Sequence, residues 1–159
     1  MGELKSLSDI FHKTLFRIPD YQRGYAWREK QLVDFWEDLI NLRADQGRYH
    51  YTGLLSLKPL NKIDASRLGR EDQWLLESGY TAKHVVDGQQ RLTTFVILLN
   101  ELLVYLCSLP ENNGKADEDI LLEYDTVKDI RSKYISRMMP HKQVMHSVDR
   151  LPVYCSFCR

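Results

Sequence analysis

The sequence predicts a mixed α/β (α+β) domain, because strand-like and helix-like patterns share one chain of ordinary domain length. Three β-rich segments, at residues 14–18, 49–57 and 81–86, precede the strongest helical pattern at 89–106. A second long helical pattern follows at 118–139. With 159 residues, the chain can bury a core without the help of disulfides or metals.

The first part of the chain is expected to contain a short helix through Phe11, a strand at 14–18, a helix at 29–43 and a strand at 49–57. Ser6 or Ser8 is expected to cap the first helix, because a hydroxyl oxygen accepts from a free N–H of the first turn. Gly47 is expected to end the second helix. Gly53, inside the second strand, indicates a bulge or a close approach of another group to the backbone.

The rest of the chain is expected to begin with a polar segment at residues 62–79, which we call the polar excursion, and a strand at 81–86. Two long helices at 89–106 and 118–139 and a final short strand at 151–157 are expected to follow. One or two helical turns around residues 71–77 interrupt the excursion. The first long helix is nearly all apolar from Phe95 onward, so it is expected to be central. Pro140 ends the second one, since proline does not continue a helix.

The charges are balanced, with 22 Lys plus Arg and 22 Asp plus Glu. This balance argues against a protein that coats DNA through bulk charge, although it is compatible with a local basic pocket. No uninterrupted apolar run approaches about 18 residues, which predicts that no helix spans a membrane. The N-terminus also lacks the apolar segment of a signal peptide.

The chain has three cysteines, Cys107, Cys155 and Cys158. An odd, small number without a secretory signal favours a reducing compartment, so we predict a cytoplasmic protein. Cys155 and Cys158 have the spacing of half a zinc site, but no second pair of ligands is spaced to complete it. We therefore interpret both as incidental.

The most informative stretch is Asp-Gly-Gln-Gln-Arg at residues 87–91, where a β-branched strand stops and a helix begins at once. A helix N-terminus carries unpaired N–H groups and about half a unit of positive charge, so it attracts phosphate or carboxylate. Arg91 adds a cationic fork, Gln89 and Gln90 add amide donors, and Gly88 lets a ligand approach the backbone. Asp87 fits a ligand of Mg²⁺, directly or through water, or a general base. The stretch predicts a site for the phosphates of a nucleotide or nucleic acid.

Each of these residues also has a structural interpretation. Asp87 fits a turn former and helix cap, and Arg91 fits a partner of a buried acid such as Asp87 or Glu37. A hydroxyl early in a helix often satisfies local backbone groups, which is the structural interpretation of Thr94. Gln89 and Gln90 are harder to explain by stability alone.

A second notable stretch, residues 16–27, is rich in aromatic side chains and arginine. Tyr21, Tyr25 and Trp27 are suited to stack on bases or to seal a pocket. Arg23 is suited to pair with phosphate, and Gln22 to hydrogen-bond a base edge or a sugar. The alternative is that the aromatic rings anchor the core and that Arg23 forms an internal ion pair.

Together, Ile-Pro-Asp-Tyr-Gln-Arg-Gly-Tyr-Ala-Trp at residues 18–27 and Val-Asp-Gly-Gln-Gln-Arg-Leu-Thr-Thr at 86–94 resemble the bacterial DGQQR-motif family. That family forms the N-terminal, GmrS-like domain of GmrSD-type modification-dependent restriction endonucleases and related anti-phage proteins. The resemblance covers about residues 8–106 and implies a ParB/sulfiredoxin-like mixed sheet core with flanking long helices. It also implies that a nucleoside triphosphate is bound and hydrolysed, coupled to restriction of modified or foreign DNA.

From the motifs and the resemblance together, we predict a catalytic role for Asp87, Gln89, Gln90 and Arg91, and a Mg²⁺ ion held by Asp87 through water. Nucleotide or phosphate binding is predicted for Tyr21, Gln22, Arg23, Tyr25, Trp27, Gly88 and Thr94. Two other interpretations stay open. The first is a nonhydrolytic module that binds DNA or another phosphate-bearing partner, and the second is an inactive remnant.

We expect a nucleotide-binding core at residues 1–109 and a helical extension at 110–159 that begins a truncated C-terminal region. The His-Asn-His nuclease motif of the complete enzymes does not occur after Arg91. A separate nuclease domain or subunit is therefore expected as a partner, with DNA reached through the full-length protein. No membrane partner is expected, and homo-oligomerisation is left open.

Overall fold

The computed structural model describes residues 3–44 and 51–135. The helices in these residues are α1 (Leu7–Phe11), α2 (Glu29–Ala44), α3 (Lys62–Ser66), α4 (Arg70–Glu77), α5 (Gln89–Ser108) and α6 (Val127–Ile130). The strands are β1 (Thr14–Arg17), β2 (Ser56–Pro59), β3 (Thr81–Asp87), β4 (Leu121–Leu122) and β5 (Asp125–Thr126). A 3₁₀ turn at Pro110–Asn112 and a π-helical turn at Arg131–Ile135 complete the description. The predicted mixed α/β class is confirmed.

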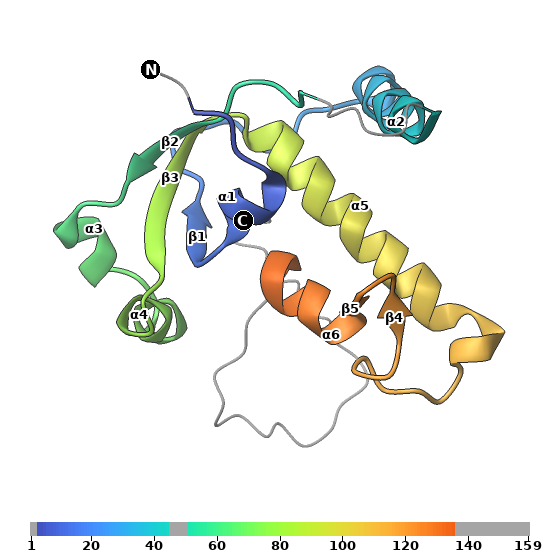
Figure 1. Cartoon of the computed structure of the whole chain (residues 1–159). Coiled ribbons are helices and arrows are strands. Elements are labelled where there is room, and N and C mark those ends of the chain that lie inside the picture. The colour runs from blue at the N-terminus through green and yellow to red at the C-terminus, as the bar shows by residue number, and fades with distance from the viewer. Residues whose placement is uncertain (1–2, 45–50, 136–159) are drawn as a thin grey trace.

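The main sheet has the strand order β1-β3-β2, with β3 in the centre (Figure 1). β1 runs parallel to β3, with Thr14 opposite Thr81 and Arg17 opposite His84, whereas β2 runs antiparallel to it. Parallel strands end at the same edge of a sheet, so the chain leaves β1 and β3 side by side. This edge is where residues 18–28 and the start of α5 meet.

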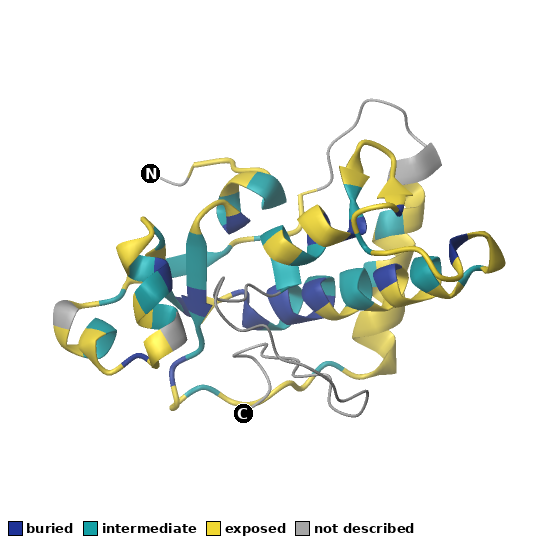
Figure 2. Ribbon diagram, turned by 90° about the horizontal axis from the view of Figure 1, so that it is seen from below, coloured by how far each residue is buried: buried dark blue, intermediate teal, exposed yellow. Residues whose placement is uncertain are grey.

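The core of the sheet half is aromatic and aliphatic. It is formed by buried side chains from α1, β1, β3 and α5, which are Phe11, Phe16, Val85, Leu92 and Val96. The rings of Phe11 and Phe16 meet edge to face with centroids 5.2 Å apart, an arrangement that aromatic pairs favour. Figure 2 shows the buried residues gathered along α5 and the neighbouring strands. This packing holds the start of α5 against the end of β3.

α1 begins with the predicted serine cap. Ser6 accepts from the backbone N–H of Asp9, and the Asp9 carboxylate accepts in turn from the Ser6 hydroxyl and N–H. These donors stabilise the charged carboxylate, so they lower the pKa of Asp9 below its ordinary value. Of the two serines considered as caps, Ser6 takes the role.

A second core cluster joins the C-terminal half of α5 to the segment that follows it. Its buried members are Leu103, Ile120, Val127 and Ile130. In Figure 1, β4, β5 and α6 lie beside this half of α5. The proposed division at residue 109 stays a prediction.

The predicted helix at residues 118–139 is wrong over its first part. Residues 121–126 form the β4–β5 hairpin, and only four residues from Val127 are α-helical. Glu123 adopts a left-handed φ of 57° at the hairpin turn, which interrupts any helix. Thr126 then caps α6, since its side chain accepts from the N–H of Asp129. Residues 136–139 and Pro140 lie outside the described residues.

The predicted strand at 49–57 is also corrected, because β2 spans only Ser56–Pro59. Pro59 is the last residue of β2, where it lies opposite Lys83, and an edge strand tolerates proline there. The polar excursion forms two helices, α3 and α4, so it is more helical than the one or two turns expected there. Gly47, the strand predicted at 151–157, Cys155 and Cys158 lie outside the described residues.

By length and composition alone, α5 is long and apolar enough to cross a membrane. The sequence did not predict this, because its apolar runs are interrupted. Core helices also meet this criterion. Within the part of the chain that the structure describes, α5 contributes side chains to both buried clusters, including Leu92, Val96 and Leu103. One face of α5 is therefore buried, whereas Ile97, Leu102, Val104 and Tyr105 are exposed. A single apolar helix of this length is weak evidence for membrane insertion.

Candidate functional site

The turn between β3 and α5 requires a glycine. Gly88 has a left-handed φ of 88°, which side chains with a Cβ rarely adopt. A Cβ at this position would lie 2.9 Å from Leu55 Cδ1 and 3.2 Å from the carbonyl oxygen of Leu54. Gly88 also provides no side-chain cap for α5. Among the described residues, no hydrogen bond is recorded for the backbone N–H groups of positions 89–91.

The two adjacent glutamines hold the segment between β1 and α2, which we call loop 18–28. Gln89 Nε2 donates to the carbonyl oxygen of Arg23 at 3.1 Å. Gln90 Nε2 donates to the carbonyl oxygen of Gly24 at 3.2 Å, and its Oε1 accepts from the backbone N–H of Ala26 at 2.8 Å. Gln89 is only 9% exposed. These contacts give both glutamines a structural purpose that the sequence alone did not suggest.

Loop 18–28 is fixed to the site by two further side chains. Gln22 Nε2 donates to the carbonyl oxygens of Val85 and Val86, both at 2.9 Å, at the end of β3. Tyr25 Oη lies 2.8 Å from Thr94 Oγ1, and the Thr94 hydroxyl donates to the carbonyl oxygen of Gln90. Since the threonine hydroxyl has one proton, Tyr25 is the donor in this pair.

Arg91 holds the segment before β2, which we call loop 51–55. Its guanidinium donates to the carbonyl oxygens of Thr52 at 2.9 Å and Leu54 at 2.7 Å. Between them lies Gly53, with a φ of 106° and no room for a Cβ beside Arg91 Nη1. The close approach predicted at Gly53 is confirmed, and its partner is Arg91. Both acceptors are neutral carbonyls, and among residues 3–44 and 51–135 no carboxylate forms an ion pair with Arg91.

The remaining predicted residues differ in exposure. Asp87, Arg23 and Tyr21 are exposed, and the side chain of Tyr21 is 80% accessible. Within residues 3–44 and 51–135, no ion pair or hydrogen bond is recorded for the carboxylate of Asp87. Trp27 instead packs against Phe35 of α2, with ring centroids 5.8 Å apart. The aromatic side chains of this loop therefore divide into exposed rings and a packing ring.

We use the term helix-start site for Asp87, Gly88, Gln89, Gln90 and Arg91 together with loops 18–28 and 51–55. Residues that are distant in the sequence meet here because β3 ends between the two loops. Sequence reasoning missed that Thr52 and Leu54 offer carbonyl oxygens to Arg91. In the sequence, the one signal for this contact was Gly53, which lies between Thr52 and Leu54.

At the start of α5, the helix-start site combines the cation of Arg91 and an uncapped helix N-terminus with the exposed carboxylate of Asp87. This arrangement is suited to bind an anion. Among the described residues, no group of three His, Cys, Asp or Glu side chains is arranged to hold a metal. Mg²⁺ at this site would therefore take most of its ligands from phosphate oxygens and water, with Asp87 as the protein's contribution.

The hold of Gln90 on loop 18–28 is testable with Gln90→Ala. We expect the Ala26 amide to exchange faster with solvent, and the free energy of unfolding to fall by about 1–2 kcal/mol, because two hydrogen bonds are lost. Hydrogen exchange and chemical denaturation measure these effects. Gln73→Ala is the matched control, since Gln73 also donates to two backbone carbonyls, in the α3–α4 link. An Ala26 amide as protected in Gln90→Ala as in the control would contradict this role.

Two comparisons with known proteins bear on the site. A family model described as "GmrSD restriction endonuclease, N-terminal domain" matches residues 5–148. This match includes both loops and the whole of the helix-start site. A search of curated proteins found no match.

Proposed function

Because the chain belongs to the family of GmrSD restriction endonuclease N-terminal domains, we propose that it binds and hydrolyses a nucleoside triphosphate within a phage-defence protein. The family assigns the chain to a component of a restriction system. In our proposal, the full-length protein contacts DNA, and a separate nuclease domain or subunit cuts it. The nucleotide occupies the helix-start site.

One observation carries this proposal. Arg91 lies in the first turn of α5, where two carbonyl oxygens hold its guanidinium and no described carboxylate forms an ion pair with it. The positive end of the α5 dipole adds to the same field. A phosphate group compensates both the charge of Arg91 and the positive end of the helix dipole, whereas a neutral ligand compensates neither of them.

In our proposal, the residues of the site have different tasks. The side chains of Gln89, Gln90 and Arg91 position loops 18–28 and 51–55. In this arrangement the exposed groups of Asp87 and Arg23 are free to meet the ligand. Arg23 pairs with phosphate, and Tyr21 stacks on the base. Gln90 orients the attacking water only if it first releases loop 18–28, so we propose that nucleotide binding rearranges this loop.

Hydrolysis in this scheme depends on positioning and charge. Asp87 accepts a proton from the attacking water or holds Mg²⁺ through water. Mg²⁺, when bound, would neutralise negative charge on the phosphate oxygens. Arg91 and the N–H groups of the first turn of α5 stabilise the charge that develops on the transferred group.

A nonhydrolytic phosphate-binding module is the second candidate, favoured by the exposure of Tyr21 beside Arg23 on one loop. Such a pair would hold a base and a backbone phosphate of single-stranded nucleic acid. The balanced charge of the chain argues against a long DNA contact. Hydrolysis separates the two candidates.

The test is release of phosphate from GTP and ATP with Mg²⁺, comparing the chain with Asp87→Asn. We expect hydrolysis by the unchanged protein and a loss of at least about 100-fold in the variant, because the carboxylate is absent. Asp87 is exposed, so the variant should keep its melting temperature. Equal rates in the two proteins would remove Asp87 from the mechanism. Saturable nucleotide binding without any phosphate release would favour the second candidate.

A further inference from the structure

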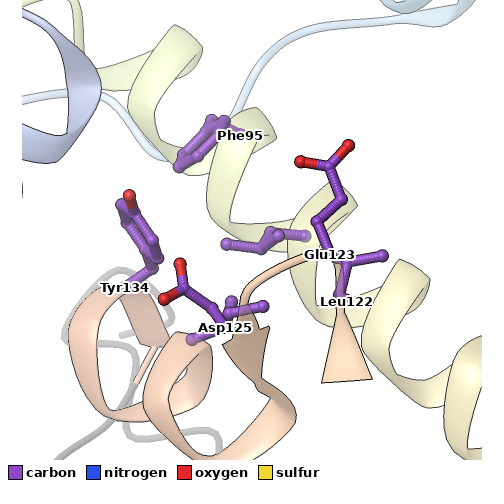
Figure 3. Close-up of a pocket in the computed structure, with 7 residues that line it drawn as sticks. Phe95, Leu122, Glu123, Asp125 and Tyr134 are labelled. Atoms are coloured by element: carbon purple, nitrogen blue, oxygen red, sulfur yellow. The ribbon is translucent and has the colours of Figure 1, made fainter. Parts of the chain in front are cut away.

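A pocket of about 380 Å³ lies between α5, the β4–β5 hairpin and the segment from α6 onward (Figure 3). None of the residues predicted for nucleotide binding lines it. The walls are formed by Phe95, Leu99, Leu122, Glu123, Asp125, Ile130 and Tyr134. Its volume falls within the range of small-molecule sites, which is about 300–1,000 Å³.

The lining has two parts of different chemistry. Phe95, Leu122 and Tyr134 present carbon surface, together with Leu99 and Ile130. Glu123 and Asp125 add two carboxylates from the hairpin. Figure 3 shows the Asp125 carboxylate turned toward Tyr134, with Glu123 rising on the opposite side.

Both carboxylates lack a recorded partner of opposite charge. Within the part of the chain that is described, no ion pair involves Glu123 or Asp125. Lys133 Nζ lies 5.2 Å from the centroid of the Tyr134 ring. A tyrosine ring of the pocket thus already accepts an ammonium group near its face.

The lining selects one class of occupant. An anion would be repelled by the two carboxylates, and a neutral apolar molecule would desolvate them without compensation. Mg²⁺ and Ca²⁺ require about six oxygen ligands, whereas most of this lining is carbon. An ammonium or amidinium group on an aromatic or aliphatic body matches both parts.

We propose that this pocket binds a small organic cation, with its apolar body against Phe95, Leu122 and Tyr134 and its charge between Glu123 and Asp125. The site is separate from the helix-start site and does not depend on nucleotide binding. The charge preference comes from the hairpin, and the affinity comes from the apolar wall.

The test is NMR titration of the folded chain with three probes of similar size, benzylammonium, benzyl alcohol and benzoate. We expect saturable shifts for benzylammonium at the signals of Leu99, Leu122 and Tyr134, with a dissociation constant on the order of millimolar. Benzyl alcohol should bind at least about fivefold more weakly, since its neutral group gains nothing from the carboxylates. Benzoate should not bind.

The variants separate charge from folding. Asp125→Asn should weaken benzylammonium binding about two- to fivefold. Glu123→Gly should weaken it by a similar factor while keeping or raising the melting temperature, because glycine adopts the left-handed turn without strain. Glu111→Gln, an exposed carboxylate outside the lining, is the control and should leave binding unchanged.

Three results of this titration would overturn the proposal. They are equal binding of benzylammonium and benzyl alcohol, shifts centred away from the pocket, and unchanged affinity in the Asp125→Asn and Glu123→Gly double variant. Binding of an arginine-containing peptide without binding of benzylammonium would also overturn it. In that case the pocket would accept a side chain of a polypeptide instead.

Discussion

Replacing Arg91 by alanine is expected to weaken nucleotide binding about 30- to 100-fold, which corresponds to about 2–3 kcal/mol. The variant loses the cation at the start of α5. It also leaves the carbonyl oxygens of Thr52 and Leu54 without their donor, so loop 51–55 loses its attachment. Calorimetric titration with GTP and ATP in the presence of Mg²⁺ measures the affinity, and chemical denaturation measures the stability.

Arg91→Lys separates the charge from the geometry. Lysine keeps the cation but lacks the planar fork that donates to two carbonyls at once. We expect a smaller loss of affinity than in Arg91→Ala and a similar loss of stability. Arg67→Ala, an exposed arginine at the end of α3, is the control. If Arg91→Ala loses stability but keeps its affinity for nucleotide, Arg91 has only a structural role.

Replacing Gly53 by alanine is expected to destabilise the protein by about 1–3 kcal/mol and to disturb Arg91. The backbone there has a φ of 106°, and an added Cβ would overlap Arg91 Nη1. Either the loop or the guanidinium must move, so nucleotide affinity should fall as well. Thermal unfolding and calorimetry measure the two effects.

Gly69→Ala is the control for this substitution, because nothing lies within 4 Å of a Cβ at Gly69 and its φ of −62° is ordinary. Its effect should stay below about 1 kcal/mol, because Gly69 is the N-cap of α4 and alanine is a poorer N-cap. The double variant Gly53→Ala/Arg91→Ala adds a second criterion. Its loss of stability should be smaller than the sum of the two single losses, since the overlap disappears with the guanidinium. Strict additivity would show that the two residues do not act on each other.

The sequence predicted the elements whose signals are local. The β3–α5 turn is marked by the β-branched residues before Asp87, the glycine after it and the apolar pattern up to Leu106. The helix predicted at 118–139 failed because Leu121, Leu122 and Tyr124 fit a helical spacing as well as a hairpin. The left-handed backbone of Glu123 has no mark in the sequence, since glutamate rarely adopts it.

The residues of the helix-start site were identifiable, but their contacts were not. From the sequence, a contribution to stability did not explain Gln89 and Gln90. The structure shows that each donates a hydrogen bond to a backbone carbonyl of loop 18–28. Every residue offers such a carbonyl, so no residue type in that loop identifies the acceptor. Gly53 did indicate a close approach, yet its partner lies far along the chain, at Arg91.

The central claim is that phosphate is bound where β3 passes into α5. The most direct measurement is amide NMR of the chain titrated with non-hydrolysable GTP and ATP analogues and Mg²⁺. Our account predicts that the largest saturable shifts fall on Gly88, Gln90, Arg91 and both loops. Shifts centred on the β4–β5 hairpin, or no saturable shift with either nucleotide, would contradict it.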